Sequence, residues 1–198
     1  MPIAELRLNR HTPDATVRAL DDMVDLYTHV YNVPPYIGDP FFSVDAFRDR
    51  LLGATELNGF ECLTVHSGET VVGLVHGVTL PAERTWWTSL GDQRPEAMVT
   101  AAKAEGVAWL RELMVRPDYG NQGIGRRLHD EWIAERRQRW TALTCIPDNE
   151  PAHGAYRRWG YEIIGRIKHA DDSPVYDAMV LPATGGPVPE GGSPRQRP

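Results

Sequence analysis

The stretch ELMVRPDYGNQGIGRRLHDEW, residues 112–132, joins an apolar run to an amphipathic run through a short segment that holds three glycines. The apolar run predicts a β-strand that ends near Val115. Beyond the glycines, Ile124, Leu128 and Trp132 recur at the spacing of one helix face and predict a helix. The stretch therefore predicts a strand, a glycine-rich turn and a helix in succession.

The glycines, Gly120, Gly123 and Gly125, lie where a helix begins. The first turn of a helix has unpaired N–H groups and a partial positive charge, so it attracts anions, and glycines let the backbone approach them closely. Two familiar phosphate loops are excluded. The Gly-Lys-Ser/Thr of a Walker A loop is missing, and Leu128 stands where the dinucleotide pattern G-x-G-x-x-G has its third glycine. On glycine spacing alone, a plain turn and an anion site are equally good interpretations.

A second motif lies in DNEPAHGAYRRWGYEIIG, residues 148–165. Together, the two stretches resemble the GNAT acyltransferase superfamily. In that family a strand ending Val-x-Pro leads into Arg/Gln-x-x-Gly-x-Gly/Ala at a helix start, and a later segment has Asn, Tyr, Gly and an aromatic residue. Gly120 departs from the pattern, because it stands where Arg or Gln is expected. The later segment is matched at Asn149, Tyr156, Gly160 and Tyr161.

The order of elements agrees with the resemblance. Strand patterns lie at 5–10, 59–66, 70–80, 106–117, 140–147, 161–170 and 174–182, and helix patterns at 12–32, 43–53, 122–138 and 149–160. We interpret residues 81–105 as a long irregular connection. The order predicts one α/β domain of the α+β kind, residues 1–182, in which helices flank a mixed sheet. The resemblance implies a GNAT-like, mostly antiparallel sheet. The Gly- and Pro-rich tail, residues 183–198, is expected to be disordered.

The composition bounds the function. Of 198 residues, 41% are hydrophobic and 24% charged, as in a soluble globular protein, and no apolar run approaches the ~20 residues of a membrane helix. We therefore expect a cytoplasmic protein with no membrane partner. A net charge of −6 argues against non-specific nucleic-acid binding and permits a cationic substrate. Cys62 and Cys145, far from any metal-ligand spacing, are expected to be buried thiols. A monomer and a homodimer both remain open.

The resemblance implies acetyl-CoA as co-substrate and no metal. The strand end formed by Leu113, Met114 and Val115 would separate from the strand that follows the glycine-loop helix, and its backbone groups would pair with the pantetheine arm. Asn149 would contact the pantetheine. The backbone N–H groups of the glycine loop would hold the pyrophosphate, and the residues concerned are Asn121, Gln122, Gly123, Ile124, Gly125 and Arg126.

The implied reaction is direct transfer of an acetyl group from the thioester to an amine. The leaving thiolate is stabilised if it is protonated as it departs, and the resemblance gives that role to Tyr156. From the residues alone, Tyr156 is also explained as a core aromatic on one helix face with Trp159.

The amine must lose a proton to a base before it attacks. Some family members have a glutamate where this sequence has Thr144, which cannot serve. Glu112 is the nearest carboxylate to the reacting strand, and burial would raise its pKa toward a useful range. It would face away from Arg111 unless a bulge intervenes, and a structural ion pair with Arg111 or Arg116 is an equal alternative. The further base candidates are His66 and His76.

The acceptor site is expected between the first two helices and the last strands. Tyr31, Tyr36, Trp86 and Trp87 would bind an apolar body or an amine, although packing under a long loop explains them as well. The sequence thus favours an N-acetyltransferase that acts on a small-molecule amine. Acetylation of a protein N-terminus or lysine is one alternative, and a non-catalytic acyl-CoA-binding regulatory module is the other.

Overall fold

The computed structural model describes residues 6–34, 36–169 and 173–182, and the expected tail at 183–198 lies outside this range. Its centre is a sheet with the order β1-β2-β3-β4-β5-β7-β6. The strands are β1 (Leu6–His11), β2 (Glu61–Ser67), β3 (Thr70–Leu80), β4 (Val107–Val115), β5 (Trp140–Cys145), β6 (Glu162–Ile167) and β7 (Tyr176–Pro182). Neighbouring strands pair antiparallel except β4 and β5, which are parallel. The predicted mixed, mostly antiparallel α/β fold is confirmed.

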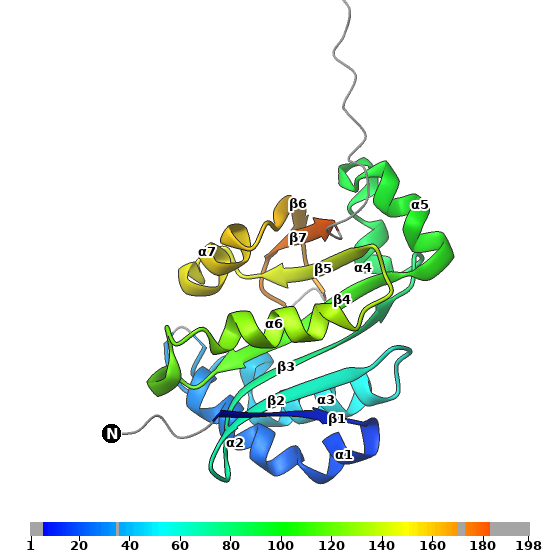
Figure 1. Cartoon of the computed structure of the whole chain (residues 1–198). Coiled ribbons are helices and arrows are strands. Elements are labelled where there is room, and N and C mark those ends of the chain that lie inside the picture. The colour runs from blue at the N-terminus through cyan, green and yellow to red at the C-terminus, as the bar shows by residue number, and fades with distance from the viewer. Residues whose placement is uncertain (1–5, 35, 170–172, 183–198) are drawn as a thin grey trace, which may run out of the picture.

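Helices cover both faces of the sheet (Figure 1). They are α1 (Pro13–Arg18), α2 (Leu20–Tyr31), α3 (Val44–Thr55), α4 (Thr85–Thr88), α5 (Glu96–Glu105), α6 (Ile124–Ala134) and α7 (Glu150–Arg158), with 3-10 turns η1 (Pro40–Phe42), η2 (Gly91–Gln93) and η3 (Pro117–Tyr119). α2 and α3 bury Tyr27, Phe47 and Leu51 against one face, and α6 buries Leu128 and Trp132 against the other. The sheet therefore lies between two packed layers.

The first predicted helix is divided in two. Thr12 caps α1 by accepting a hydrogen bond from the Ala15 N–H, and Pro13 opens the helix, as the sequence indicates. The chain then leaves helical geometry at Ala19, and α2 begins at the next residue. Val17, in the last turn of α1, is 47% exposed.

The interpretation of residues 81–105 as an irregular connection was wrong. This segment holds α4, η2 and the ten-residue helix α5, whose Met98, Ala101 and Ala102 are buried. α5 ends at Gly106, which adopts φ +72°, a conformation that favours glycine. In the part of the chain that the structure describes, no helix combines the length and the apolar character needed to cross a membrane.

Candidate active site

The site begins where β4 and β5 separate. Their parallel pairing covers Ala108 with Thr141 and Trp109 with Ala142, although β4 continues to Val115 and β5 to Cys145. In Figure 1 the two strands lie side by side near α5 and diverge from there. The backbone of β4 beyond Trp109 therefore has no register with β5 among the described residues. We call this opening the cleft; it matches the separation expected for the strand that ends in Leu113, Met114 and Val115.

The cleft opens into a cavity of about 590 Å³, which we call the central cavity. Its wall combines β4 and β5 with side chains from α2, α3, α7 and the 32–43 segment. Leu113 lies on this wall, whereas Met114 is buried against α2 and α3. The sequence-predicted residues that the structure brings together here are Tyr31, Tyr36, Glu112, Leu113, Asn149 and Tyr156.

The glycine-rich segment connects the end of β4 to the start of α6. Asn121 and Gly123 adopt positive φ angles of 59° and 79°, and Gly123 is the N-cap of α6. Asparagine and glycine are the residues that tolerate this conformation best. No side chain caps the helix at Gly123, so its first N–H groups and the positive end of its dipole face outward. A Cβ on Gly123 would meet nothing within 4 Å, so the helix start is open to a ligand.

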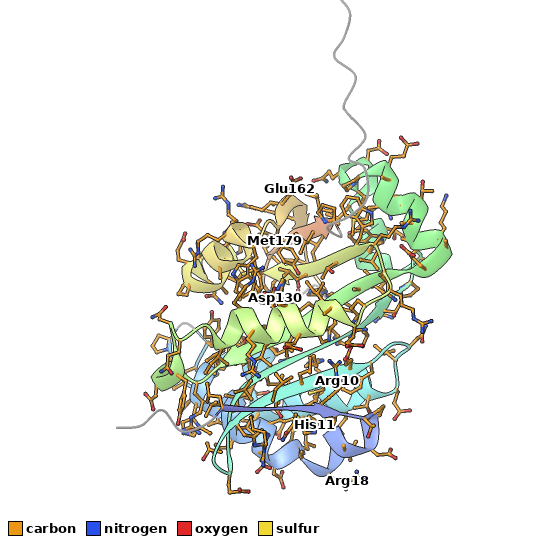
Figure 2. The ribbon with its side chains drawn as sticks, viewed as in Figure 1. Arg10, His11, Arg18, Asp130, Glu162 and Met179 are labelled. Atoms are coloured by element: carbon orange, nitrogen blue, oxygen red, sulfur yellow. The ribbon has the colours of Figure 1, made fainter. Side chains whose placement is uncertain are left out.

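Gly120, the departure from the family pattern, has an ordinary backbone conformation, with φ −61°. A Cβ there would lie 3.0 Å from the carbonyl oxygen of Pro117, so a larger residue requires a small shift of the turn. Arg126, expected to add positive charge at the loop, donates a 2.6 Å hydrogen bond to Asp130 one turn along α6. Figure 2 shows Asp130 on this helix. The loop therefore offers mainly backbone groups to an anion.

A bulge in β4 decides where its charged residues point. His76 of β3 pairs with Glu112, but the next residue, Gly77, pairs with Leu110, so Arg111 is an extra residue in the ladder. As a result, Arg111 and Glu112 both face the central cavity, while Leu110 packs toward α6. The expected opposite orientation of Arg111 and Glu112 does not occur, because the alternation of the strand is interrupted between them.

Glu112 is held by Tyr31, whose hydroxyl donates a 2.7 Å hydrogen bond to Oε1 of the carboxylate. Burial raises the pKa of Glu112 above its usual range, and the hydrogen bond from Tyr31, with the charges of Arg50 and Arg111, opposes part of that rise. No described residue forms an ion pair with Glu112. The structural pairing with Arg116 considered above is replaced by one between Arg116 and Asp25, 3.3 Å apart.

Tyr156 lies on α7, and its ring packs edge-on against Trp159 and Tyr161. It is 7% exposed and contributes to the wall of the central cavity, so it is both a packed aromatic and a cavity residue. Burial raises its pKa well above that of free tyrosine, and the negative charge of nearby Glu112 adds to the rise. The hydroxyl therefore keeps its proton at neutral pH.

Asn149 begins α7 at the other side of the cleft. Its side-chain oxygen accepts a hydrogen bond from the Ala152 N–H and caps the helix, and its side chain also hydrogen-bonds to the hydroxyl of Tyr36. Tyr36 packs edge-on against Tyr31, with ring centroids 5.0 Å apart. These contacts connect the cap of α7 with the aromatic wall of the cavity.

Of the two histidines considered as bases, one lies on the cavity wall and the other does not. His76 lies on the cavity wall, but burial lowers its pKa to about 3, so its imidazole is a weak base. His66 hydrogen-bonds to Thr64 away from the cavity. Cys62 and Cys145 are free and buried as predicted, and burial raises the pKa of each thiol to about 12.

The structure does not bring Trp87 to the central cavity. It is 1% exposed and packs in the core with Met98 of α5, since the segment that carries it is folded rather than a loose connection. Trp86 lies in α4, and its side chain is outside the described part of the structure. Neither tryptophan contributes a described side chain to the aromatic wall.

Sequence reasoning missed most of the cavity wall. Arg50, Arg84, Arg111 and Lys168 supply cationic groups, and Phe41, Phe42, Trp109, His169 and Tyr176 supply rings. These residues come from segments far apart in the chain, so no local pattern links them. One local signal was present in the sequence. An isolated glycine within a strand often marks a bulge, and Gly77 lies opposite the bulge that turns Arg111 into the cavity.

Comparisons with known proteins agree with this geometry. The model of the acetyltransferase (GNAT) family matches residues 20–161. Among solved structures, an acetyltransferase from Thermus thermophilus is 17% identical, with a TM-score of 0.60 over 92% of this chain and 99% of that one. The PaiA N-acetyltransferase from Thermoplasma acidophilum, solved in complex with coenzyme A, is 12% identical, with a TM-score of 0.58 over 90% and 99%.

The ribosomal-protein-S18-alanine N-acetyltransferase from Escherichia coli is 15% identical, with a TM-score of 0.60 over 92% of this chain and 97% of that one. No curated protein matches the sequence. At these identities the solved structures establish the fold alone, whereas the family model covers well over half of the chain. The family and the cleft together support an acetyl-CoA-dependent acyltransferase. This chain is a member of the acetyltransferase (GNAT) family.

Proposed function

We propose that the protein transfers an acetyl group from acetyl-CoA to the primary amine of a small molecule, by direct attack of the amine on the thioester. The observation that carries the proposal is the cleft between β4 and β5. It opens into the central cavity, which also holds a buried carboxylate, Glu112, and a protonated phenol, Tyr156. An acyl donor and an amine can therefore meet between a base and an acid.

The residues around the cleft fit acetyl-CoA. An extended pantetheine arm needs backbone partners, and the part of β4 beyond Trp109 is free of pairing with β5. A pyrophosphate needs N–H donors and positive charge, which the uncapped start of α6 at Gly123 offers. Asn149 would contact the pantetheine from the opposite wall. The thioester that this co-substrate supplies needs no metal for aminolysis.

Glu112 is the proposed base. An ammonium ion has no lone pair, so the carboxylate must accept its proton before attack. The raised pKa of Glu112 makes it a better proton acceptor than an exposed glutamate, while the hydrogen bond from Tyr31 keeps the charged form accessible. His76, with a pKa of about 3, is the weaker candidate.

Tyr156 is the proposed acid. As the carbon–sulfur bond breaks, the sulfur gains negative charge, and a phenol that still holds its proton can give it to the thiolate. Tyr156 holds its proton at neutral pH, and its place on the wall of the central cavity supports this role. The oxyanion of the tetrahedral intermediate needs a nearby donor, for which the N–H groups of residues 113–115 are candidates.

A small acceptor is supported by the aromatic lining of the cavity. Rings from α2, the 32–43 segment and β7 surround it, and they include Tyr31, Phe42 and Tyr176. Acetylation of a protein N-terminus or lysine would need an open groove for an extended chain. A non-catalytic acyl-CoA-binding module would not need Glu112 and Tyr156 beside the cleft.

The test is a panel of small amines and peptides, assayed for release of the free thiol of coenzyme A. We expect turnover with small amines and little with peptides. Turnover confined to peptides would overturn the small-molecule assignment, and inactivity across the panel would favour the regulatory module. Acetyl-CoA should also raise the melting temperature, because it binds the native state selectively.

A second test concerns Tyr156. Tyr156→Phe should lower kcat by about 10²-fold, with a much smaller change in acetyl-CoA affinity. The matched control is Tyr161→Phe, which removes a hydroxyl from the same aromatic cluster; that hydroxyl hydrogen-bonds to His129, and Tyr161 does not line the central cavity. Equal kcat values for the two variants would contradict the acid role.

A further inference from the structure

The charge of the central cavity is opposite to that of the whole protein. The chain carries a net charge of −6, yet four cationic side chains and one carboxylate line the cavity among the described residues. The cations are Arg50, Arg84, Arg111 and Lys168, and the carboxylate is Glu112. We infer that the acceptor amine also carries an anionic group, a carboxylate or a phosphonate, which binds at Arg50, Arg84 and Arg111.

The inference rests on the proposed function, and it deepens it by naming the class of acceptor. We call Arg50, Arg84 and Arg111 the arginine cluster. The cluster needs an external anion only if no carboxylate of the protein pairs with these three arginines.

Arg111 is the innermost member. The bulge in β4 turns it into the cavity, where its guanidinium lies over the ring of Trp109, 4.8 Å from the centroid. Burial is the main cause that lowers the pKa of Arg111 to about 10; the positive charges of Arg50 and Arg84 add to this lowering, and the negative charge of Glu112 opposes it. The group therefore stays charged at neutral pH. A buried cation beside two others is unfavourable unless an anion compensates it.

Arg50 approaches the same space from α3. Its Nη1 donates a 2.7 Å hydrogen bond to the carbonyl oxygen of Phe41, and its guanidinium lies over the Phe41 ring. Its Nη2 also donates to the Tyr27 hydroxyl, 3.4 Å away, and no carboxylate among the described residues forms an ion pair with Arg50. Arg84, an exposed residue between β3 and α4, completes the cluster at the wall of the cavity.

Among the residues that the structure describes, Glu112 is the carboxylate whose charge acts on Arg50 and Arg111. In the described part of the structure, no carboxylate lies within ion-pair distance of Arg50, Arg84 or Arg111. Glu112 lies nearby, but its carboxylate takes its hydrogen bond from Tyr31. Asp39 is engaged as the cap of η1, accepting from the Phe41 N–H. Burial is the main cause that lowers the pKa of His169 to about 4, and the positive charges of Arg111, Arg50 and Arg84 add to this lowering.

The phosphates of acetyl-CoA do not explain the cluster. The proposed pyrophosphate site is the start of α6, and residues 117–126 do not line the central cavity. The arginines instead surround the space bounded by Phe41, Trp109 and Tyr176, on the side of the sheet covered by α3. The anion that they would bind therefore belongs to the acceptor.

The side chains on the cavity wall also indicate which class of acceptor fits. Glu112 and Arg111 are consecutive residues that face the same cavity, so an amine at the first and an anion at the second fit within one short molecule. The rings of Phe41, Trp109 and Tyr176 suit an apolar body between or beside these groups. An amino acid with an apolar side chain has this combination, and guanidinium groups bind carboxylates through paired hydrogen bonds.

The experiment compares amines that differ only in the anionic group. The pairs are L-phenylalanine with phenethylamine, L-tryptophan with tryptamine, and 2-aminoethylphosphonate with ethanolamine, each assayed by release of coenzyme A thiol. We expect kcat/KM to be at least tenfold higher for the anionic member of the preferred pair. Arg84→Gln and Arg111→Gln should each reduce that ratio at least fivefold, mainly through KM. Because Arg84 is exposed, its variant keeps the test independent of folding.

The matched control is Arg48→Gln, also on α3, where Arg48 donates to Asp21 outside the cavity. This variant should keep the wild-type ratio. Equal or higher kcat/KM for the neutral partners would overturn the inference while leaving the proposed acetyltransferase intact.

A direct binding measurement distinguishes failure of the proposed acetyltransferase function from failure of the proposed anion site. Calorimetric titration of N-acetyl-L-phenylalanine and N-acetylphenethylamine measures recognition of the anion without catalysis. Tighter binding of the acid, lost in Arg84→Gln, supports the anion site even if no amine is acetylated, and in that case the proposed function alone fails. Equal binding of both compounds, together with inactivity toward every amine, would overturn both.

Discussion

The two sides of the cleft are built from different kinds of chemical group. On the side of α6, the structure offers backbone: the unpaired part of β4 and the uncapped helix start at Gly123. On the side of α3, it offers side chains: Glu112, the arginine cluster and a set of rings. A backbone site binds what every family member shares, whereas a side-chain site can differ from one member to the next. Under the proposed function, the donor and the acceptor would therefore be recognised by separate means.

We call the α6 side of the cleft the backbone half and the α3 side the side-chain half. The largest expected effect on activity comes from a substitution in the side-chain half. Glu112→Gln keeps an oxygen that can accept from Tyr31 but removes the base, so kcat should fall by about 10²–10⁴-fold. Stabilisation by acetyl-CoA should persist in a thermal melt, because the backbone half is unchanged. Glu131→Gln, an exposed carboxylate on α6, is the control and should retain full activity.

If Glu112→Gln lost acetyl-CoA binding together with turnover, the two halves would not be separate. Retention of full turnover would instead exclude Glu112 as the base.

A smaller effect is expected from Tyr31→Phe, which removes the hydrogen bond that lowers the pKa of Glu112. Burial already raises this pKa above 4.5, so without the hydrogen bond it rises further. Since the base must be deprotonated, activity is lost as the pH falls through this pKa. The acidic limb of the kcat/KM profile should therefore move to higher pH, measured with one amine at saturating acetyl-CoA for both proteins. A limb that stays in place would show that Glu112 does not control it.

The smallest expected effects are on stability, and they come from two glycines of the backbone half, Gly123 and Gly125. Gly123→Ala forces a side chain into φ +79° and should destabilise the protein by about 1 kcal/mol. Gly125→Ala adds a Cβ at 3.6 Å from Val115 in ordinary helical geometry and should be neutral or stabilise by up to about 1 kcal/mol. Urea denaturation without ligand measures both. Equal midpoints for the two variants would contradict the left-handed cap.

The same difference explains what the sequence could predict. The backbone half comes from one contiguous stretch, so its strand, turn and helix are all present in residues 112–132 and the cleft could be expected. The cavity wall unites Arg50, Arg84 and Tyr176 from distant segments, and no periodicity relates them. The positive charge of the wall was also hidden, because the net charge of −6 describes the whole surface.

Of the two helices or breaks that the sequence analysis missed, only α5 had a local signal. α5 lies between Pro95, which precedes the helix, and Gly106, which follows it, a usual frame for a helix. The polar start of the segment and its two tryptophans obscured that pattern. The break at Ala19 had none, because the spacing of apolar residues continues through it and only packing on the sheet reveals two helices.

The bulge at Arg111 also bears on how such a site can change over time. His76 faces Glu112 and Gly77 faces Leu110, so loss of Arg111 alone would leave an uninterrupted ladder, with the carboxylate still opposite His76. One codon inserted or deleted at this position therefore adds or removes a cationic side chain without moving the base. If Glu112 is the base and Arg111 binds the acceptor, as proposed, substrate preference and proton transfer can evolve independently although adjacent residues carry them.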